Sequence, residues 1–128
     1  MNKPTQDLQS QFLTAFNKGF ESSSTTTPEF AAFSNLFHSY LKSGAKDVGL
    51  NVISFSRGHF EASAFIEAPN GKFAYVSLSD VRGNSPASSK KILYRTAKHA
   101  KDFHGGNNLW LPLDSKELFN KIKALLEV

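Results

Sequence analysis

The chain has 128 residues, and 15 lysine and arginine residues against 11 aspartate and glutamate residues give it a formal net charge of +4. Its 40% hydrophobic and 20% charged content is typical of a globular chain, and the length fits one domain rather than two. The absence of cysteine excludes disulfides, thiolate catalysis and cysteine-based zinc sites, and it fits a cytoplasmic protein. No apolar run reaches the roughly 18 residues of a membrane span, and the first residues lack a signal peptide's apolar stretch, so we expect no membrane partner.

Two helices are predicted in the first part of the chain. The first covers residues 5–20, where Leu8, Phe12, Leu13, Phe16 and Phe20 recur at helical spacing. Residues 21–27 are serine and threonine apart from the leading glutamate, and they suggest a flexible linker. Thr27 and Pro28 are typical of a helix start, and the second helix should end near Gly44. Because the linker would let the first helix exchange between protomers, a homodimer is one expected partner, and a protein-interaction or dimerising accessory protein is an alternative function.

Residues 48–81 change to a period of two, which predicts three antiparallel strands. The strands are separated by Arg57-Gly58 and by Pro69-Asn70-Gly71. If Asn70-Gly71 forms a two-residue turn, Ile66 faces Tyr75 in the neighbouring strand. One face of the sheet then carries Phe55, Phe60, Ile66, Phe73 and Tyr75, and the other carries Phe65, Val76 and Leu78. Both faces are partly apolar, so helices or a partner chain should cover them.

Residues 88–113 carry the strongest functional signal, because five of the fifteen basic residues lie between Lys90 and Lys101. On a helical wheel of residues 90–104, the apolar side chains fall on one side and the basic ones on the other. We therefore predict an amphipathic helix that ends at Gly105. The run Ile-Leu-Tyr-Arg-Thr also has strand propensity, so a strand followed by a basic loop is the alternative.

A short edge strand over residues 108–113, with Pro112 near its end, and a helix opened by Asp114-Ser-Lys-Glu117 as a capping box complete the prediction. The fold class is α+β. It comprises two N-terminal helices, a three-stranded antiparallel meander, the basic amphipathic helix, the edge strand and a C-terminal helix. Residues 1–128 form one domain, in which residues 28–128 are the compact core and residues 1–20 are the first helix.

The basic side of the predicted helix suggests a nucleic-acid-binding protein without catalysis. Lys91, Arg95 and Lys98 would align along one side, and such a row can follow the phosphates of RNA or DNA. Tyr94 would lie among them and stack on a base or a ribose. The site predicted to bind nucleic acid is thus Lys90, Lys91, Tyr94, Arg95, Lys98 and Lys101. The alternative is a solvated lysine-rich face.

A helix, three antiparallel strands and a helix beginning at Ser89-Lys90-Lys91 resemble the double-stranded-RNA-binding domain over about residues 29–104. In that family the lysines at the start of the last helix meet phosphates across the groove, and the resemblance implies the same role for Lys90 and Lys91. The chain departs from the family pattern at Leu93 and Tyr94, where the family has an alanine and a further lysine. The first helix and the strand-helix tail are also foreign to that family.

Histidines suggest a second chemistry. His99, Asp102 and His104 are candidate metal ligands, but no third strong ligand has a diagnostic spacing, so no metal is predicted. A histidine acting as general acid or base, with a strand carboxylate and an arginine, resembles the metal-independent microbial ribonucleases. If residues 92–107 are a strand and a loop, YRTAKHAKDF is similar to the tract that carries their catalytic histidine. The candidate catalytic residues under this alternative are His99, His104, Arg95, Glu61 and Glu67. Without a Rossmann, phosphate-loop or EF-hand pattern, no cofactor is predicted.

Overall fold

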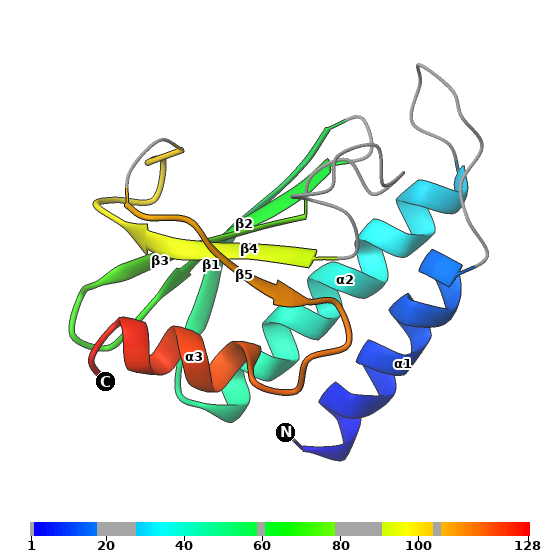
Figure 1. Ribbon diagram of the computed structural model, residues 1–128, viewed down its shortest axis with the longest axis horizontal. Coiled ribbons are helices and arrows are strands. Elements are labelled where there is room, and N and C mark those ends of the chain that lie inside the picture. The colour runs from blue at the N-terminus through cyan, green and yellow to red at the C-terminus, as the bar shows by residue number, and fades with distance from the viewer. Residues whose placement is uncertain (1, 18–27, 59–60, 79–90, 104–105) are drawn as a thin grey trace.

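The computed structural model describes residues 2–17, 28–58, 61–78, 91–103 and 106–128. Their elements are α1 (Lys3–Asn17), α2 (Pro28–Asp47), β1 (Asn51–Gly58), β2 (Glu61–Glu67), β3 (Phe73–Leu78), β4 (Lys91–Ala97), β5 (Leu109–Pro112) and α3 (Leu118–Leu125). The strands form one antiparallel sheet in the order β1-β2-β3-β4-β5, and the helices lie together on one side of it (Figure 1). The predicted α+β class is confirmed.

The core lies between the helices and the sheet, and large side chains of the helices meet small ones of the sheet. The ring of Phe12 in α1 lies 5.5 Å from that of Phe37 and 4.9 Å from that of Tyr40, both in α2. The facing positions of β2 and β3 include three buried alanines, Ala62, Ala64 and Ala74. Because alanine leaves room above the sheet, the aromatic layer of α2 can approach it closely.

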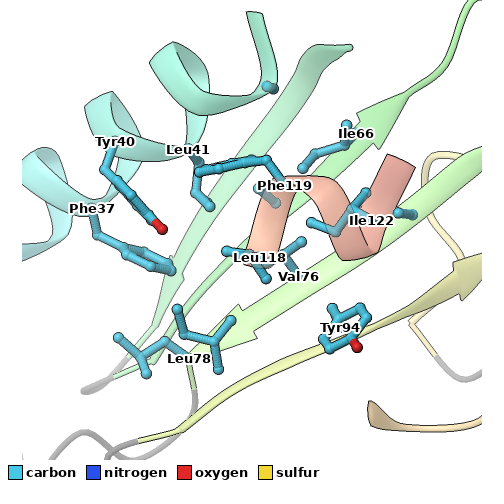
Figure 2. Packing of buried hydrophobic residues seen from close by; sticks show 14 of the residues in the cluster. Phe37, Tyr40, Leu41, Ile66, Val76, Leu78, Tyr94, Leu118, Phe119 and Ile122 are labelled. Atoms are coloured by element: carbon cyan, nitrogen blue, oxygen red, sulfur yellow. The ribbon is translucent and has the colours of Figure 1, made fainter. Parts of the chain in front are cut away.

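Helix α3 closes the core at the β4 side of the sheet, with Leu118, Phe119 and Ile122 buried. Figure 2 shows Leu118 and Ile122 close to Val76, while Tyr40 of α2 approaches Phe119. Gly44 of α2 makes this approach possible, because a Cβ atom there would overlap the Phe119 ring.

Polar side chains fix α1 in place on its own chain. The Thr5 hydroxyl donates to the Asp47 carboxylate at 2.6 Å, and the Asn2 side-chain amide donates to the same carboxylate at 2.7 Å. At the middle of α1, Gln9 Nε2 donates to the Ser115 carbonyl at 2.8 Å. The predicted linker, residues 21–27, and the last three residues of the predicted first helix lie outside the described residues. Exchange of α1 between protomers stays a prediction.

The β2–β3 hairpin differs from its prediction by one residue. Ile66 pairs with Ala74 rather than with Tyr75, because the connection is Pro69-Asn70-Gly71 and not Asn70-Gly71 alone. The Gly71 amide donates to the Ala68 carbonyl, and Gly71 has a φ of +82°, which is the geometry of a three-residue hairpin loop. A one-residue shift reverses which side chains share a face. Ile66 thus joins Val76 and Leu78 beneath the helices, and Tyr75 joins Phe65 on the opposite face.

The predicted basic amphipathic helix is wrong, because Lys91–Ala97 is strand β4. This segment pairs with β3 on one side and with β5 on the other. Ile92 and Tyr94 face the helices, while Leu93 and Arg95 face the other side of the sheet, as the period of two of a strand requires. The alternative, a strand followed by a basic loop, is correct. The resemblance to the double-stranded-RNA-binding domain required a helix from Lys90 onward and is overturned with it.

The end of the chain follows its prediction more closely. Strand β5 coincides with the predicted edge strand and ends at Pro112. Helix α3 begins at Leu118 without the predicted capping box, and Ser115 Oγ instead accepts from the Glu117 amide at 3.1 Å. Within the described ranges, no helix combines the length and the apolarity that a bilayer crossing requires.

Candidate nucleic-acid interface

The face of the sheet opposite the helices carries three of the candidate residues, Lys91, Arg95 and Glu67, and we call it the outer face. In an antiparallel pair, residues directly opposite each other point to the same side. The register places Phe65, Tyr75 and Arg95 in one row of this face, and Ser63, Ser77, Leu93 and Trp110 in the next. Lys91 follows at the start of β4. The outer face therefore combines serines, aromatic rings and cations.

Arg95 is buried on the outer face, with an exposed fraction of 2%. Its guanidinium donates to the Thr96 carbonyl at 2.9 Å and to the Asp102 carbonyl at 2.7 Å, and it lies 4.5 Å above the Tyr75 ring. Asp102 in turn accepts from the Lys98 amide at 2.8 Å. Arg95 thus holds the turn of residues 98–103 against the sheet. The predicted alignment of Lys91, Arg95 and Lys98 along one side of a helix is not formed, because Lys91–Ala97 is a strand and Arg95 is buried.

This turn brings Phe103 onto the outer face. The Phe103 ring meets Phe65 at 5.1 Å and Tyr75 at 5.8 Å, nearly perpendicular to both. Edge-to-face contacts of this kind fix a ring at favourable geometry. Phe103 nevertheless remains 47% exposed, and Trp110 on β5 is 37% exposed. Two large aromatic side chains thus lie exposed on the outer face, and Phe65 and Tyr75 support one of them, Phe103.

Among the predicted basic residues, Lys91, Lys98 and Lys101 are exposed. Lys91 begins β4, while Lys98 and Lys101 follow its other end, so the cations flank a strand that spans about 20 Å. Lys90 lies outside the described residues. Tyr94, with 7% exposure, faces the helices and packs with the core (Figure 2), and it does not lie among the exposed lysines where the predicted stacking would place it.

The candidate catalytic residues are only partly brought together. Glu67 of β2 pairs with Phe73 of β3, and Phe73 pairs with Ala97 of β4. His99 follows Ala97 by two residues, so Glu67 and His99 belong to the same end of the sheet. His99 is exposed, and its Nδ1 accepts from the Lys101 amide at 3.2 Å. Glu61 begins β2, about 20 Å from Glu67 along the strand, and its side chain is not among those described.

Arg95 belongs to the same end of the face as Glu67 and His99, but its donors bind backbone carbonyls instead of facing a substrate. His104 lies outside the described residues. Among the residues that are described, no three histidine, aspartate or glutamate side chains come close enough to hold a metal ion. The candidate catalytic residues are therefore not assembled into one site within the described part of the chain.

Helix α2 carries two groups with shifted pKa values, His38 and Tyr40. His38 of α2 stacks on Phe55 at 4.1 Å, and burial, followed by the charge of Lys42, lowers the pKa of His38. Burial raises the pKa of Tyr40. These groups face the core side of the sheet, so they do not contribute to the outer face.

Sequence reasoning missed Phe103 and gave Trp110 no role in binding. The signal that could have found them is a strand prediction for residues 91–97. A period of two there places Lys91, Leu93 and Arg95 on one face of the sheet, with Trp110 of the edge strand beside them. Comparison with known proteins gives no match to a protein-family model, to a curated protein or to a solved structure. Function is therefore inferred from the geometry of the outer face.

Proposed function

We propose that the protein binds nucleic acid through its outer face and does not cleave it. The observation that carries this proposal is the placement of Lys91 at one end of β4, and of Lys98 and Lys101 at the other, around outward-facing rings. Cations spaced in this way can neutralise phosphates at both ends of a short nucleic-acid segment. The net charge of +4 adds a long-range attraction toward polyanions.

Phosphate contacts predict a definite dependence on salt. Each neutralised phosphate contributes a slope of roughly 0.7 for single strands, or about 0.9 for B-DNA, to log K against log salt concentration. Contacts from Lys91, Lys98 and Lys101 should thus give a slope of about 2 to 3. Binding through these lysines should depend little on base sequence.

The test compares two triple variants that lose equal charge. We replace Lys91, Lys98 and Lys101 by glutamine, and as a control we replace Lys116, Lys121 and Lys123 near and on α3. Binding to a fluorescently labelled oligonucleotide is followed by anisotropy between 50 and 200 mM salt, the range over which phosphate contacts lose strength. The outer-face variant should lose most of its affinity and its salt slope, and the control should retain both.

Equal losses in the two variants would show that only net charge matters. Unchanged binding in the outer-face variant, or no binding by the wild-type protein at moderate salt, would contradict the proposal. The melting temperatures of both variants should stay close to that of the wild type, because exposed charges contribute little to stability.

A metal-independent ribonuclease is the second candidate, and one observation favours it. Residues 91–103 are a strand and a turn, the arrangement in which YRTAKHAKDF is similar to the tract of the microbial ribonucleases. The register also brings Glu67, and not Glu61, to the end of the sheet where His99 lies. Such an enzyme should cleave RNA in the presence of a chelator, with a bell-shaped pH profile. RNA that survives stoichiometric protein between pH 5 and 8 would exclude this candidate.

A further inference from the structure

We propose that the outer face selects single-stranded over duplex nucleic acid, with one base stacked on Phe103 and one on Trp110. This inference depends on the proposed function and gives it a substrate class. Unpaired bases expose a flat aromatic face that protein rings can stack on, whatever the base. The two side chains are the outward-facing rings described above, and they lie on the same face of the sheet as Lys91.

The spacing of the two rings favours an unpaired strand. Phe103 lies over Tyr75 on β3, and Trp110 is on β5, so β4 separates them. Their rows on β4, marked by Arg95 and Leu93, are two residues apart. Tyr75 and Trp110 are therefore separated by two strand spacings across the sheet and by two residues along it, which together amount to roughly 12 Å. Neighbouring bases of a duplex are about 3.4 Å apart in a closed stack, so rings this distant need bases that are splayed out.

The support beneath each ring also favours stacking. Phe65 and Tyr75 fix Phe103 from two sides, and Arg95 holds the turn that carries it. Trp110 lies on a strand beside Leu93. A ring that is already ordered loses little conformational entropy when a base stacks on it. A duplex would leave both rings without a partner, because its base faces are buried in the stack.

The flanking cations complete the site for a short segment. Lys91 lies two residues before Leu93, the partner of Trp110, and Lys98 and Lys101 follow the other end of β4 in the turn that carries Phe103. A strand that stacks one base on each ring would thus carry phosphates toward lysines on both sides. These charges also set the occupant apart from an apolar peptide, which would gain nothing from them.

The experiment uses Trp110 as its own reporter, since it is the only tryptophan of the chain. Three probes are titrated into the protein at equal phosphate count: a single-stranded 12-nucleotide RNA, a duplex, and an abasic strand that carries phosphates without bases. The single strand should quench Trp110 fluorescence and bind at least ten times more tightly than the other two. The duplex and the abasic strand should leave the fluorescence nearly unchanged.

Variants then separate stacking from charge. Phe103→Leu should weaken single-strand binding by about 5- to 150-fold, which converts the roughly 1–3 kcal/mol of one base–aromatic stack. Phe103→Tyr should restore it, since the ring returns. Ile53→Ala is the matched control, because Ile53 is another exposed large apolar side chain, at 37%, but lies on β1, the edge strand opposite β5. Circular dichroism verifies the fold of each variant.

The outcomes distinguish this inference from the proposed function. The inference would be overturned if the three probes bound equally well or if the duplex bound more tightly. The proposed function would still stand in that case, provided that the lysine variant alone loses binding. An abasic strand that binds as tightly as the RNA would also overturn the inference. If none of the probes binds at moderate salt, both proposals fall. An unchanged affinity in Phe103→Leu would remove Phe103 from the site and with it the two-base arrangement.

Discussion

Replacing Arg95 by methionine should destabilise the protein strongly, because Arg95 joins β4 to the turn of residues 98–103. Methionine retains an unbranched stem but loses both guanidinium hydrogen bonds, at 2.9 and 2.7 Å, and the contact with Tyr75 at 4.5 Å. Hydrogen bonds to a charged group contribute about 1.5–3 kcal/mol each, and a buried cation–π contact contributes up to about 2 kcal/mol. Part of this loss of stability is offset, because the methionine variant no longer has to bury a charged group.

We expect the free energy of unfolding to fall by about 2–4 kcal/mol, a typical cost for breaking a buried polar network. Urea unfolding at pH 7 measures this loss, and Lys98→Met provides the control, because Lys98 is an exposed cation in the same segment. The control should change stability by less than about 0.5 kcal/mol. If the two variants are equally stable, Arg95 does not hold the turn. A double-mutant cycle with Tyr75→Leu then isolates the ring contact, with a coupling of about 0.5–2 kcal/mol expected.

Two further predictions concern the helical layer. Gly44→Ala should cost at least about 1–3 kcal/mol, because the added methyl overlaps the Phe119 ring, and Phe119→Leu should recover part of it in thermal unfolding. The lowered pKa of His38 makes the unfolded chain take up a proton first as the pH falls. Stability should therefore decline from about pH 6.5 downward until His38 protonates in the folded state, and His38→Gln should flatten this decline in urea midpoints measured from pH 7.5 to 5.5. A decline that His38→Gln leaves intact would assign it to another group.

Local sequence patterns were sufficient to predict those elements whose structure depends only on their own residues. The Thr27-Pro28 start of α2, the edge strand with Pro112 and the presence of a C-terminal helix were predicted from their own residues. The segment of residues 91–97 was not, because its apolar residues fit a helical stripe and a strand alternation equally well. Pairing with β3 and β5 decides between them, and those partners are distant in sequence.

The candidate site was predicted in part for a similar reason. Lys91, Lys98 and Lys101 are exposed as expected, since lysines seldom lose their hydration. Arg95 is buried because two backbone carbonyls and a ring satisfy its guanidinium, and such partners appear only once the turn is folded. Phe103 belongs to the apolar side of the helix predicted for residues 90–104, whereas in the structure that same turn places it, 47% exposed, on the outer face. The wrong secondary structure predicted for residues 90–104 therefore gave both Arg95 and Phe103 the wrong environment.

The hydrogen bond of Gln9 has a consequence for the order of folding during synthesis. Its acceptors, the Leu113 and Ser115 carbonyls, lie 104 and 106 residues further along the chain. Gln9 therefore leaves the ribosome long before its partners exist, while α2 follows it closely. We expect the α1–α2 pair to form early, with Phe12 as its centre. The position of α1 should become fixed only after the β5–α3 connection has been synthesised. Ribosome-bound chains that stop short of residue 113 should consequently expose α1 to proteolysis, and the released chain should protect it.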